Sequence, residues 1–384
     1  MSRKYGPIFQ ATSIFLMAFQ SFVAPMLLGL ESFGQQIIFL SSVLLSQAIF
    51  EPIVQTICNR SALHDERILN VSNILLGFFI SCCTCFASLY ISGAENFGLP
   101  LLTLLLILYL SNTFFAAISF SENAIGIVAV SSSGLLFTYL IGFGLSHIFL
   151  PGWELIVGLT LGMSASVALF CGYWIRNGWG RIIKLGSLNF GEVLNGFTFR
   201  LPTVVLTTVN ILFLSWFGFS ATVIGQYKIF VSVIMAGRYF NLVPLPQAQM
   251  YLQMVFTNGN CKETREALLR YAVSFAIFTL VASLILPMLF DYAFKDRQFS
   301  RVDLLLSSGA ILLQPTAYAA LASRGQNNIS VTAISIIACA LFGSVFIFVT
   351  KILQDPFIAT GPSVIVTLCF YWVSLRHAKR DVSP

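Results

Sequence analysis

The chain has 384 residues, of which 57% are apolar and only 9% are charged, whereas soluble proteins carry about 25% charged residues. Its 21 Lys and Arg side chains outnumber its 15 Asp and Glu side chains, for a net charge of +6. This composition leaves too little polar surface for a water-soluble globule, so it excludes an ordinary soluble domain and predicts a membrane protein.

The hydrophobic runs predict about twelve transmembrane helices, because each span needs roughly 20 apolar residues and the runs fill the chain. The runs are continuous rather than alternating, which excludes a transmembrane barrel. In chain order the predicted spans are 8–28, 35–57, 68–92, 101–120, 124–149, 153–175, 199–218, 222–246, 271–290, 304–322, 329–350 and 356–375.

The positions of Lys and Arg predict the orientation, because cytoplasmic loops carry an excess of these residues. A cytoplasmic N-terminus places most of them on the inner side and only four on the outer side, so both termini are expected in the cytoplasm. Because these bases lie between hydrophobic runs rather than on one exposed face, we expect no nucleic-acid partner. The four outer residues are Lys295, Arg297, Arg301 and Lys351.

The longest inner connection, residues 176–199, alternates basic and apolar side chains. It predicts either an amphipathic helix at the inner interface or an extension of the seventh span into the cytoplasm. This connection also marks the midpoint of the chain.

The sequence contains a candidate internal repeat. When the chain is aligned with itself at an offset of 191 residues, residues 34–41 (GQQIIFLS) match residues 225–232 (GQYKIFVS) at five of eight positions. A chance match between two apolar helices is the alternative. If the repeat is real, the chain is an all-α polytopic membrane protein of two six-helix lobes, related by a pseudo-two-fold axis along the membrane normal. The predicted division is an N-terminal lobe over 1–175, a connection over 176–198 and a C-terminal lobe over 199–384.

Charged candidates inside the predicted spans are Glu51, Arg200, Lys228 and Arg238, because a charge in the membrane costs several kcal/mol and marks a functional candidate. Glu51 and Arg238 lie ~24 Å from the outer start of their predicted helices, Arg200 ~27 Å and Lys228 ~9 Å. Each has a structural alternative: Arg200 and Lys228 snorkel to lipid headgroups, or Arg238 pairs with Glu51. Glu51, which precedes a proline, is a candidate coupling group or counter-ion. Polar residues in the spans are weaker candidates: Gln10, Gln20, Gln47, Asn112, Asn210 and Gln314.

The sign of these charges favours an anionic substrate, because Arg200 and Arg238 against Glu51 leave one positive charge and Lys228 adds another. Guanidinium groups bind phosphate oxygens in bidentate fashion, so a diphosphate headgroup is a natural ligand. The predicted substrate-binding residues are Arg200, Arg238, Lys228 and Gln47.

Two short patterns carry a family resemblance. A Lys-x-Gly stands near the start of each half, at Lys4–Gly6 and Lys184–Gly186, and residues 218–227 (GFSATVIGQY) open the eighth span. With the twelve-span layout, these patterns resemble the bacterial O-antigen and polysaccharide flippases of the multidrug/oligosaccharidyl-lipid/polysaccharide exporter superfamily. The sequence departs from the family at Asn210, where family members often have Asp.

The resemblance implies a flippase that moves an undecaprenyl-diphosphate-linked oligosaccharide from the inner to the outer leaflet of the bacterial inner membrane by alternating access. It implies coupling to a proton or sodium gradient and no bound cofactor. The implied partners are the lipid-linked oligosaccharide, membrane lipids and polysaccharide assembly proteins.

Two other function classes compete. A multidrug or small-solute cation-coupled antiporter of the same superfamily predicts an acidic cleft, for which Glu51 is the one convincing buried acid. A membrane-embedded polymerase or transferase needs catalytic carboxylates or a long outer loop, and the chain offers neither, so we expect no enzyme and no catalytic residues. Cys82 and Cys85 have CxxC spacing without a further ligand nearby, so no metal site is predicted.

Overall fold

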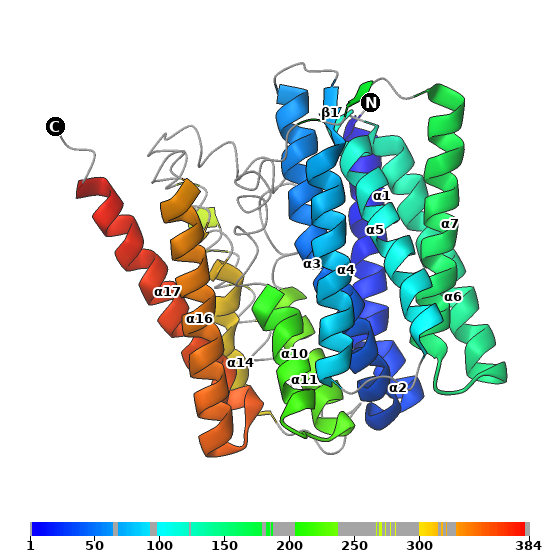
Figure 1. Cartoon of the computed structure of the whole chain (residues 1–384). Coiled ribbons are helices and arrows are strands. Elements are labelled where there is room, and N and C mark those ends of the chain that lie inside the picture. The colour runs from blue at the N-terminus through cyan, green and yellow to red at the C-terminus, as the bar shows by residue number, and fades with distance from the viewer. Residues whose placement is uncertain are drawn as a thin grey trace. The chain divides into compact units, whose positions relative to one another are not determined.

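The described part of the computed structural model consists mainly of long helices (Figure 1). It divides into two compact units, the first comprising Met1–Phe197 with Ser220–Thr222 and the second Thr198–Phe219 with Val223–Pro384. The predicted three-part division, with a separate connection, stays a prediction. The structure describes residues 2–63, 68–92, 98–122, 124–178, 182–184, 186, 204–236, 266, 269–270, 273, 277, 281, 299–313, 316–317, 320 and 328–380.

The first unit is a helical bundle whose first span contains a π-helical segment and ends at a glycine. A π-helical segment, η1 (Phe19–Val23), follows α1, and the left-handed Gly29 (φ 75°) separates α2 from α3. Such a φ suits a residue without a Cβ, so the chain can reverse there. The helices of this unit are α1 (Ser2–Ala18), α2 (Ala24–Leu28), α3 (Leu30–Leu63), α4 (Val71–Ser92), α5 (Leu99–Ser121), α6 (Ile125–Phe149) and α7 (Glu154–Asn177).

Glycines let α6 and α7 approach closely. Gly158 and Gly162 are one turn apart on α7, as in small-residue contacts between membrane helices. A Cβ added at Gly162 would lie 2.9 Å from the Leu135 carbonyl oxygen, and one added at Gly142 would lie 3.1 Å from the Gly158 Cα. The two helices therefore form a tight antiparallel hairpin within the first unit.

Two three-residue strands correct the sequence prediction. Strand β1 (Ile68–Asn70) pairs in parallel with β2 (Ile182–Lys184), with Ile68 opposite Ile182. Residues 68–70 were expected to begin the third span, and instead they form β1. The connection 176–199 was expected to form an amphipathic helix or to extend the seventh span. The structure describes only its residues 176–178, 182–184 and 186, with α7 ending at Asn177 and Ile182–Lys184 extended, so the rest of that connection stays a prediction. β-Branched isoleucines favour extended backbone, and pairing satisfies the amides of both segments outside the helices.

The second unit repeats the opening of the first, with a π-helical segment, a short helix and a left-handed glycine, Gly218 (φ 76°), before the next helix. Of the predicted span 271–290, the structure describes only Val273, Ile277 and Val281, each helical. The described elements are η3 (Val205–Val209), α10 (Asn210–Trp216), α11 (Ala221–Ala236), α14 (Arg301–Ser307), the 3-10 turn η5 (Ser308–Leu312), α16 (Asn328–Leu353) and α17 (Pro356–Arg380).

Aromatic rings form the core of the second unit. Tyr227 and Phe230 on α11 pack against Phe357 at the start of α17, with ring centroids 6.0 and 5.4 Å from it. Phe346 on α16 and Phe299 complete the cluster, and all five rings are buried. The cluster therefore joins the ends of α11, α16 and α17.

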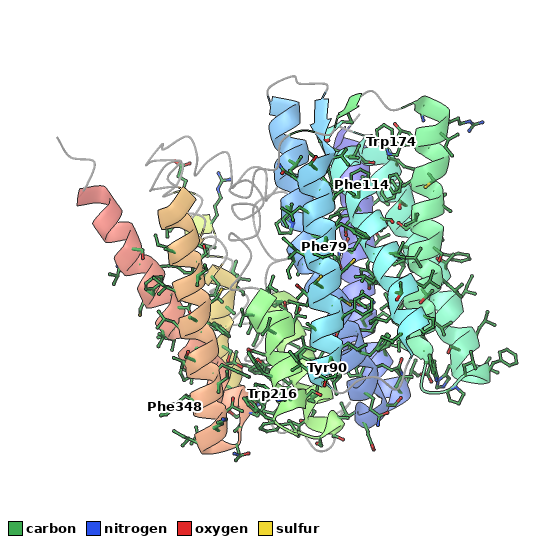
Figure 2. The ribbon with its side chains drawn as sticks, in the orientation of Figure 1. Phe79, Tyr90, Phe114, Trp174, Trp216 and Phe348 are labelled. Atoms are coloured by element: carbon green, nitrogen blue, oxygen red, sulfur yellow. The ribbon has the colours of Figure 1, made fainter. Side chains whose placement is uncertain are left out.

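Apolar side chains cover the outside of the helices as well as the inside. Phe79, Tyr90, Trp216 and Phe348 are exposed, and Figure 2 shows such side chains projecting from the ribbon. Within the described residues, eight helices are long and apolar enough to cross a membrane, and Val205–Trp216 and Ala221–Met235 are shorter apolar helices. A chain that exposes this much apolar surface requires a lipid environment.

Candidate functional site

The structure describes three of the five predicted site residues. Gln47 and Glu51 lie on α3 in the first unit, and Lys228 lies on α11 in the second. Arg200 and Arg238 lie outside the described residues, so the predicted cluster of bases stays a prediction.

A polar stripe runs along one side of α3, on which Gln47, Glu51 and Gln55 follow one another at four-residue intervals. This spacing places them on one face of the helix. All three are half-buried, and the Gln55 Nε2 donates to the Glu51 Oε1 at 2.9 Å. The structure thus brings two of the predicted residues together and adds Gln55, which the same spacing could have identified. We call Gln47, Glu51 and Gln55 the α3 polar face.

The setting of this face distinguishes it from lipid-exposed surface. Helix α3 is the most completely covered of the candidate spans, and its residues on the other sides at this level, such as Phe50 and Val54, are buried. A carboxylate facing acyl chains would cost several kcal/mol, so the accessible side of Glu51 requires water or polar groups. The α3 polar face is therefore a candidate site for a cation or a proton.

Pro52 adds to the polarity of the same face. It lies inside α3 and has no N–H, so the carbonyl of Ala48 loses its usual helical donor. Ala48 is half-buried and lies between Gln47 and Glu51 on the accessible side. Amide oxygens, a backbone carbonyl and one carboxylate together make a site that attracts positive charge.

The depth of Glu51 differs from the prediction. Helix α3 begins at Leu30 rather than residue 35, which places Glu51 21 residues into the helix, or ~31 Å along it. The prediction was ~24 Å, in one layer with Arg238. The left-handed Gly29 explains the earlier start, because the turn is completed in a single residue.

Lys228 is a half-buried cation in an apolar helix. It lies seven residues after the start of α11, at ~10 Å, between the buried Tyr227 and Ile229. Within the part of the chain that the structure describes, no hydrogen bond or ion pair of its ammonium group is found. A cation in such a position suits an anionic ligand or lipid headgroup.

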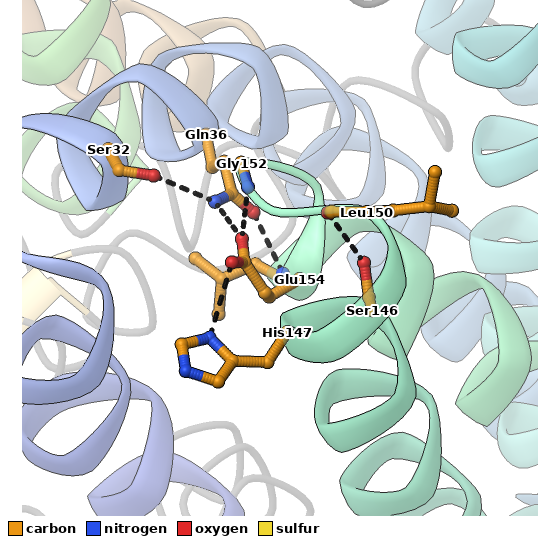
Figure 3. A network of polar contacts seen from close by, with 8 residues as sticks. Ser32, Gln36, Ser146, His147, Leu150, Gly152 and Glu154 are labelled. Atoms are coloured by element: carbon orange, nitrogen blue, oxygen red, sulfur yellow. Dashed lines mark hydrogen bonds and ion pairs between the residues drawn. The ribbon is translucent and has the colours of Figure 1, made fainter.

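Sequence reasoning missed a buried polar network at the predicted outer end of the first unit (Figure 3). Glu154, in the first turn of α7, is almost fully buried and accepts hydrogen bonds from Gln36 Nε2 at 3.0 Å and from the Gly152 amide at 2.9 Å. The His147 Nδ1 lies 3.4 Å from its other oxygen. Gln36 in turn accepts from the Leu155 amide at 2.8 Å. The one sequence signal was the repeat, which includes Gln36.

A second buried network lies within the second unit. The Asn210 Nδ2 donates to the Tyr227 hydroxyl at 2.9 Å, and that hydroxyl lies 3.2 Å from the Thr360 Oγ1, which donates to the Pro356 carbonyl. Asn210 was a weaker sequence candidate. Since Asn210, Tyr227 and Thr360 are all uncharged, this network holds helices together without presenting a charge.

Comparisons with known proteins identify solved structures with a similar fold. No family model and no curated protein match the chain. Among solved structures, an inward-facing multidrug resistance MATE family transporter of the MOP superfamily has 12% identity and a TM-score of 0.62, over 97% of this chain and 96% of that one. A MOP superfamily transporter from Pyrococcus furiosus Vc1 has 12% identity and a TM-score of 0.60, over 99% and 94%. MATE in the bent conformation has 13% identity and a TM-score of 0.56, over 98% and 93%.

At these identities the likeness shows the fold. It confirms the predicted class, an all-α multi-pass membrane protein of about twelve helices in two lobes, to which the structure adds the pair of short strands. The similar structures are membrane transporters rather than enzymes and belong to the superfamily that the sequence patterns resemble.

Proposed function

We propose that the chain is a cation-coupled antiporter that exports multidrug-type or other small cationic solutes by alternating access between its two lobes. The observation on which this depends is the α3 polar face, where one carboxylate, Glu51, stands among the amides of Gln47 and Gln55 on a helix that is otherwise covered. Negative charge at such a site attracts an organic cation or a proton or sodium ion. The similarity to a multidrug resistance transporter supports the same proposal.

The proposal includes the inner membrane of a bacterium, both termini in the cytoplasm, and a proton or sodium gradient as the energy source. Solute and coupling ion would compete for Glu51, so that binding of one displaces the other. No bond is made or broken in this cycle, and the chain acts without catalytic residues or a bound cofactor.

Ethidium efflux tests this proposal. Bacterial cells that lack their own exporters are loaded with ethidium, and its loss is followed by fluorescence with wild type, Glu51→Gln and Glu31→Gln. Glu31 is a matched control because it is an exposed acid at the start of the same helix. We expect wild type and Glu31→Gln to export the dye and Glu51→Gln to lose at least about tenfold in rate, equivalent to ~1.4 kcal/mol. Wild-type efflux by Glu51→Gln would contradict the proposal.

A second candidate is the lipid-linked oligosaccharide flippase, favoured by Lys228, the half-buried cation of α11. In this reading Arg200 and Arg238 bind the diphosphate headgroup from the inner leaflet, Gln47 contacts it, and Lys228 receives it near the outer face. Glu51 is then a coupling group or counter-ion. Membrane lipids and polysaccharide assembly proteins are the expected partners. The similar transporter from Pyrococcus furiosus is described as having a binding pocket of reverse polarity that suggests a different function, so binding pockets on this fold differ in polarity.

Surface polysaccharide distinguishes the flippase from the antiporter. Arg238→Ala should abolish it with membrane abundance intact, whereas Arg238→Lys should retain part of it, because the charge survives and the bidentate fork does not. If a strain whose only copy of this protein is Arg238→Ala makes a normal amount of surface polysaccharide, the flippase mechanism is contradicted.

A further inference from the structure

The buried network of Figure 3 joins the ends of three helices, with Gln36 on α3, His147 on α6 and Glu154 on α7. Glu154 lies in the first turn of α7 and His147 in the last turn of α6. The N-terminal end of a helix favours negative charge and the C-terminal end favours positive charge, so both helix ends favour an ionised Glu154 beside a protonated His147. The pair is therefore placed to form an ion pair when His147 gains a proton.

The two partners differ in their access to water. The Glu154 side chain is 3% exposed and the His147 side chain is 47% exposed. Protons from the adjoining solution can thus reach the imidazole, while the carboxylate stays inside the protein. The imidazole ring also stacks on the buried Phe143, with 9° between the ring planes, which orients its Nδ1.

The carboxylate links the hairpin to α3. The Glu154 Oε2 accepts from both Gln36 Nε2 and the Gly152 amide, and Gly152 has a left-handed φ of 91°. Gln36 also accepts from the Leu155 amide, so it attaches α3 to the first turn of α7 by two hydrogen bonds. Any change of charge beside Glu154 therefore acts on the attachment of α3, the helix with the α3 polar face.

Few other charged groups face this pair. Helix α6 packs against α1, α5 and α7, and α7 packs also against α3. On these helices Glu31 is exposed in the first turn of α3 and Glu51 lies 15 residues beyond Gln36. The remaining charged residues of these segments, Arg3, Lys4, Arg60, Glu122 and Arg176, belong to the opposite ends of the helices. Tyr139 precedes His147 on α6, and tyrosine is neutral between mildly acidic and mildly alkaline pH.

We propose that His147 and Glu154 form a proton-operated latch that fastens the start of α3 to the α6–α7 hairpin when the solution at the predicted outer side becomes acidic. Proton uptake by His147 converts a weak contact with Glu154 into an ion pair, and proton loss releases it. In the acidic state the ion pair ties α6 to α7 beside the Gln36 contacts of α3. The latch does not rest on the proposed function, because it acts on the helices whatever the transported solute.

Thermal unfolding of the full chain in detergent micelles tests the latch. The intrinsic fluorescence of the five tryptophans reports Tm at about pH 5.5 and about pH 8, on either side of the usual histidine titration. We expect the Tm of wild type to be about 1 to 2 °C higher than that of His147→Gln at the acidic pH, because one partly exposed ion pair contributes little stability. At the alkaline pH we expect the two Tm values to be equal. Salt should reduce this difference.

Matched variants separate the latch from other titrations. The chain has three histidines, so His64→Gln and His377→Gln serve as controls and should keep the wild-type pH dependence. Glu154→Gln should remove the difference between wild type and His147→Gln at acidic pH. Should Glu154→Gln fail to fold, amide exchange of the peptide around Leu155 in His147→Gln provides the second measurement, with faster exchange expected at acidic pH only. An unchanged pH dependence in His147→Gln would overturn the proposal.

Discussion

Gln36 and Tyr227 occupy equivalent positions in the two halves of the chain, 191 residues apart. Both are fully buried. Gln36 bonds to the start of α7, the last described helix of the first unit, and Tyr227 contacts Thr360 near the start of α17, the last helix of the second. In each unit the helix that carries this residue follows a π-helical segment, a short helix and a left-handed glycine. The short sequence match at these positions is thus accompanied by a parallel local structure, which agrees with the predicted internal repeat.

Removing either residue should destabilise its unit. Gln36→Ala removes the acceptor of the Leu155 amide and one of the donors to the buried Glu154, and we expect a loss of about 2–4 kcal/mol in the free energy of unfolding. Gln35→Ala, at the exposed neighbouring position, should change it by less than about 0.5 kcal/mol. Denaturant titration of the purified variants in micelles measures both, and equal effects would contradict the role of Gln36.

Tyr227→Phe tests the equivalent contact in the second unit. It removes one hydroxyl while keeping the ring among Phe230, Phe346 and Phe357. The Asn210 amide then loses its acceptor, so we expect a cost of about 1–3 kcal/mol. The same denaturant titration applies, and a neutral effect would mean that Asn210 finds another partner at no cost.

The close approach of α6 and α7 predicts a strong dependence on the size of Gly162. Gly162→Ala would place its Cβ 2.9 Å from the Leu135 carbonyl oxygen, so the helices must separate, and we expect a loss of at least about 1–3 kcal/mol. Gly144→Ala on α6 meets nothing within 4 Å and should be neutral or slightly stabilising. The melting temperatures of Gly162→Ala and Gly144→Ala, measured under the same conditions, test this prediction. Equal melting temperatures would contradict the close packing of α6 and α7 at Gly162.

The amides of the α3 polar face should affect transport separately from stability. Gln47→Leu and Gln55→Leu keep the size of the side chains but remove the polar groups beside Glu51, so we expect ethidium efflux to fall several-fold with normal membrane abundance. Gln35→Leu, exposed at the start of the same helix, is the control. If all three variants transport equally, the α3 polar face is not part of the solute pathway.

Lys228 should show a trade-off between stability and function. An ammonium group in an apolar helix is costly, so Lys228→Met should raise the free energy of unfolding by about 1 kcal/mol. The antiporter proposal expects dye efflux to persist in this variant, whereas the flippase candidate expects surface polysaccharide to be lost. Lys351→Met, which alters an exposed cation over the Phe217 ring, is the control and should not be stabilising. A less stable Lys228→Met would indicate a structural role instead.

The sequence identified two of the three residues of the α3 polar face and little of its surroundings. Glu51 and Gln47 were candidates because an ionised or polar residue inside a hydrophobic run is recognisable from the sequence alone. Gln55 lies at the same helical spacing but near the predicted inner end, where a polar residue is ordinary. Glu154 lies at the edge of a predicted span and was not a candidate, whereas the structure buries it. Burial at an edge depends on which neighbouring helix covers it, and hydropathy does not contain that information.

By itself the sequence determined that this is a multi-pass helical membrane protein, because each run of apolar residues is long enough to span lipid and must satisfy its own backbone amides. It also located most turns and the repeat. Only the tertiary structure decided which polar residues meet, as with Gln36 and Glu154, which are 118 positions apart, and where β1 pairs with β2. Such contacts depend on the rotation and offset of packed helices, which are set by side chains from distant parts of the chain acting together.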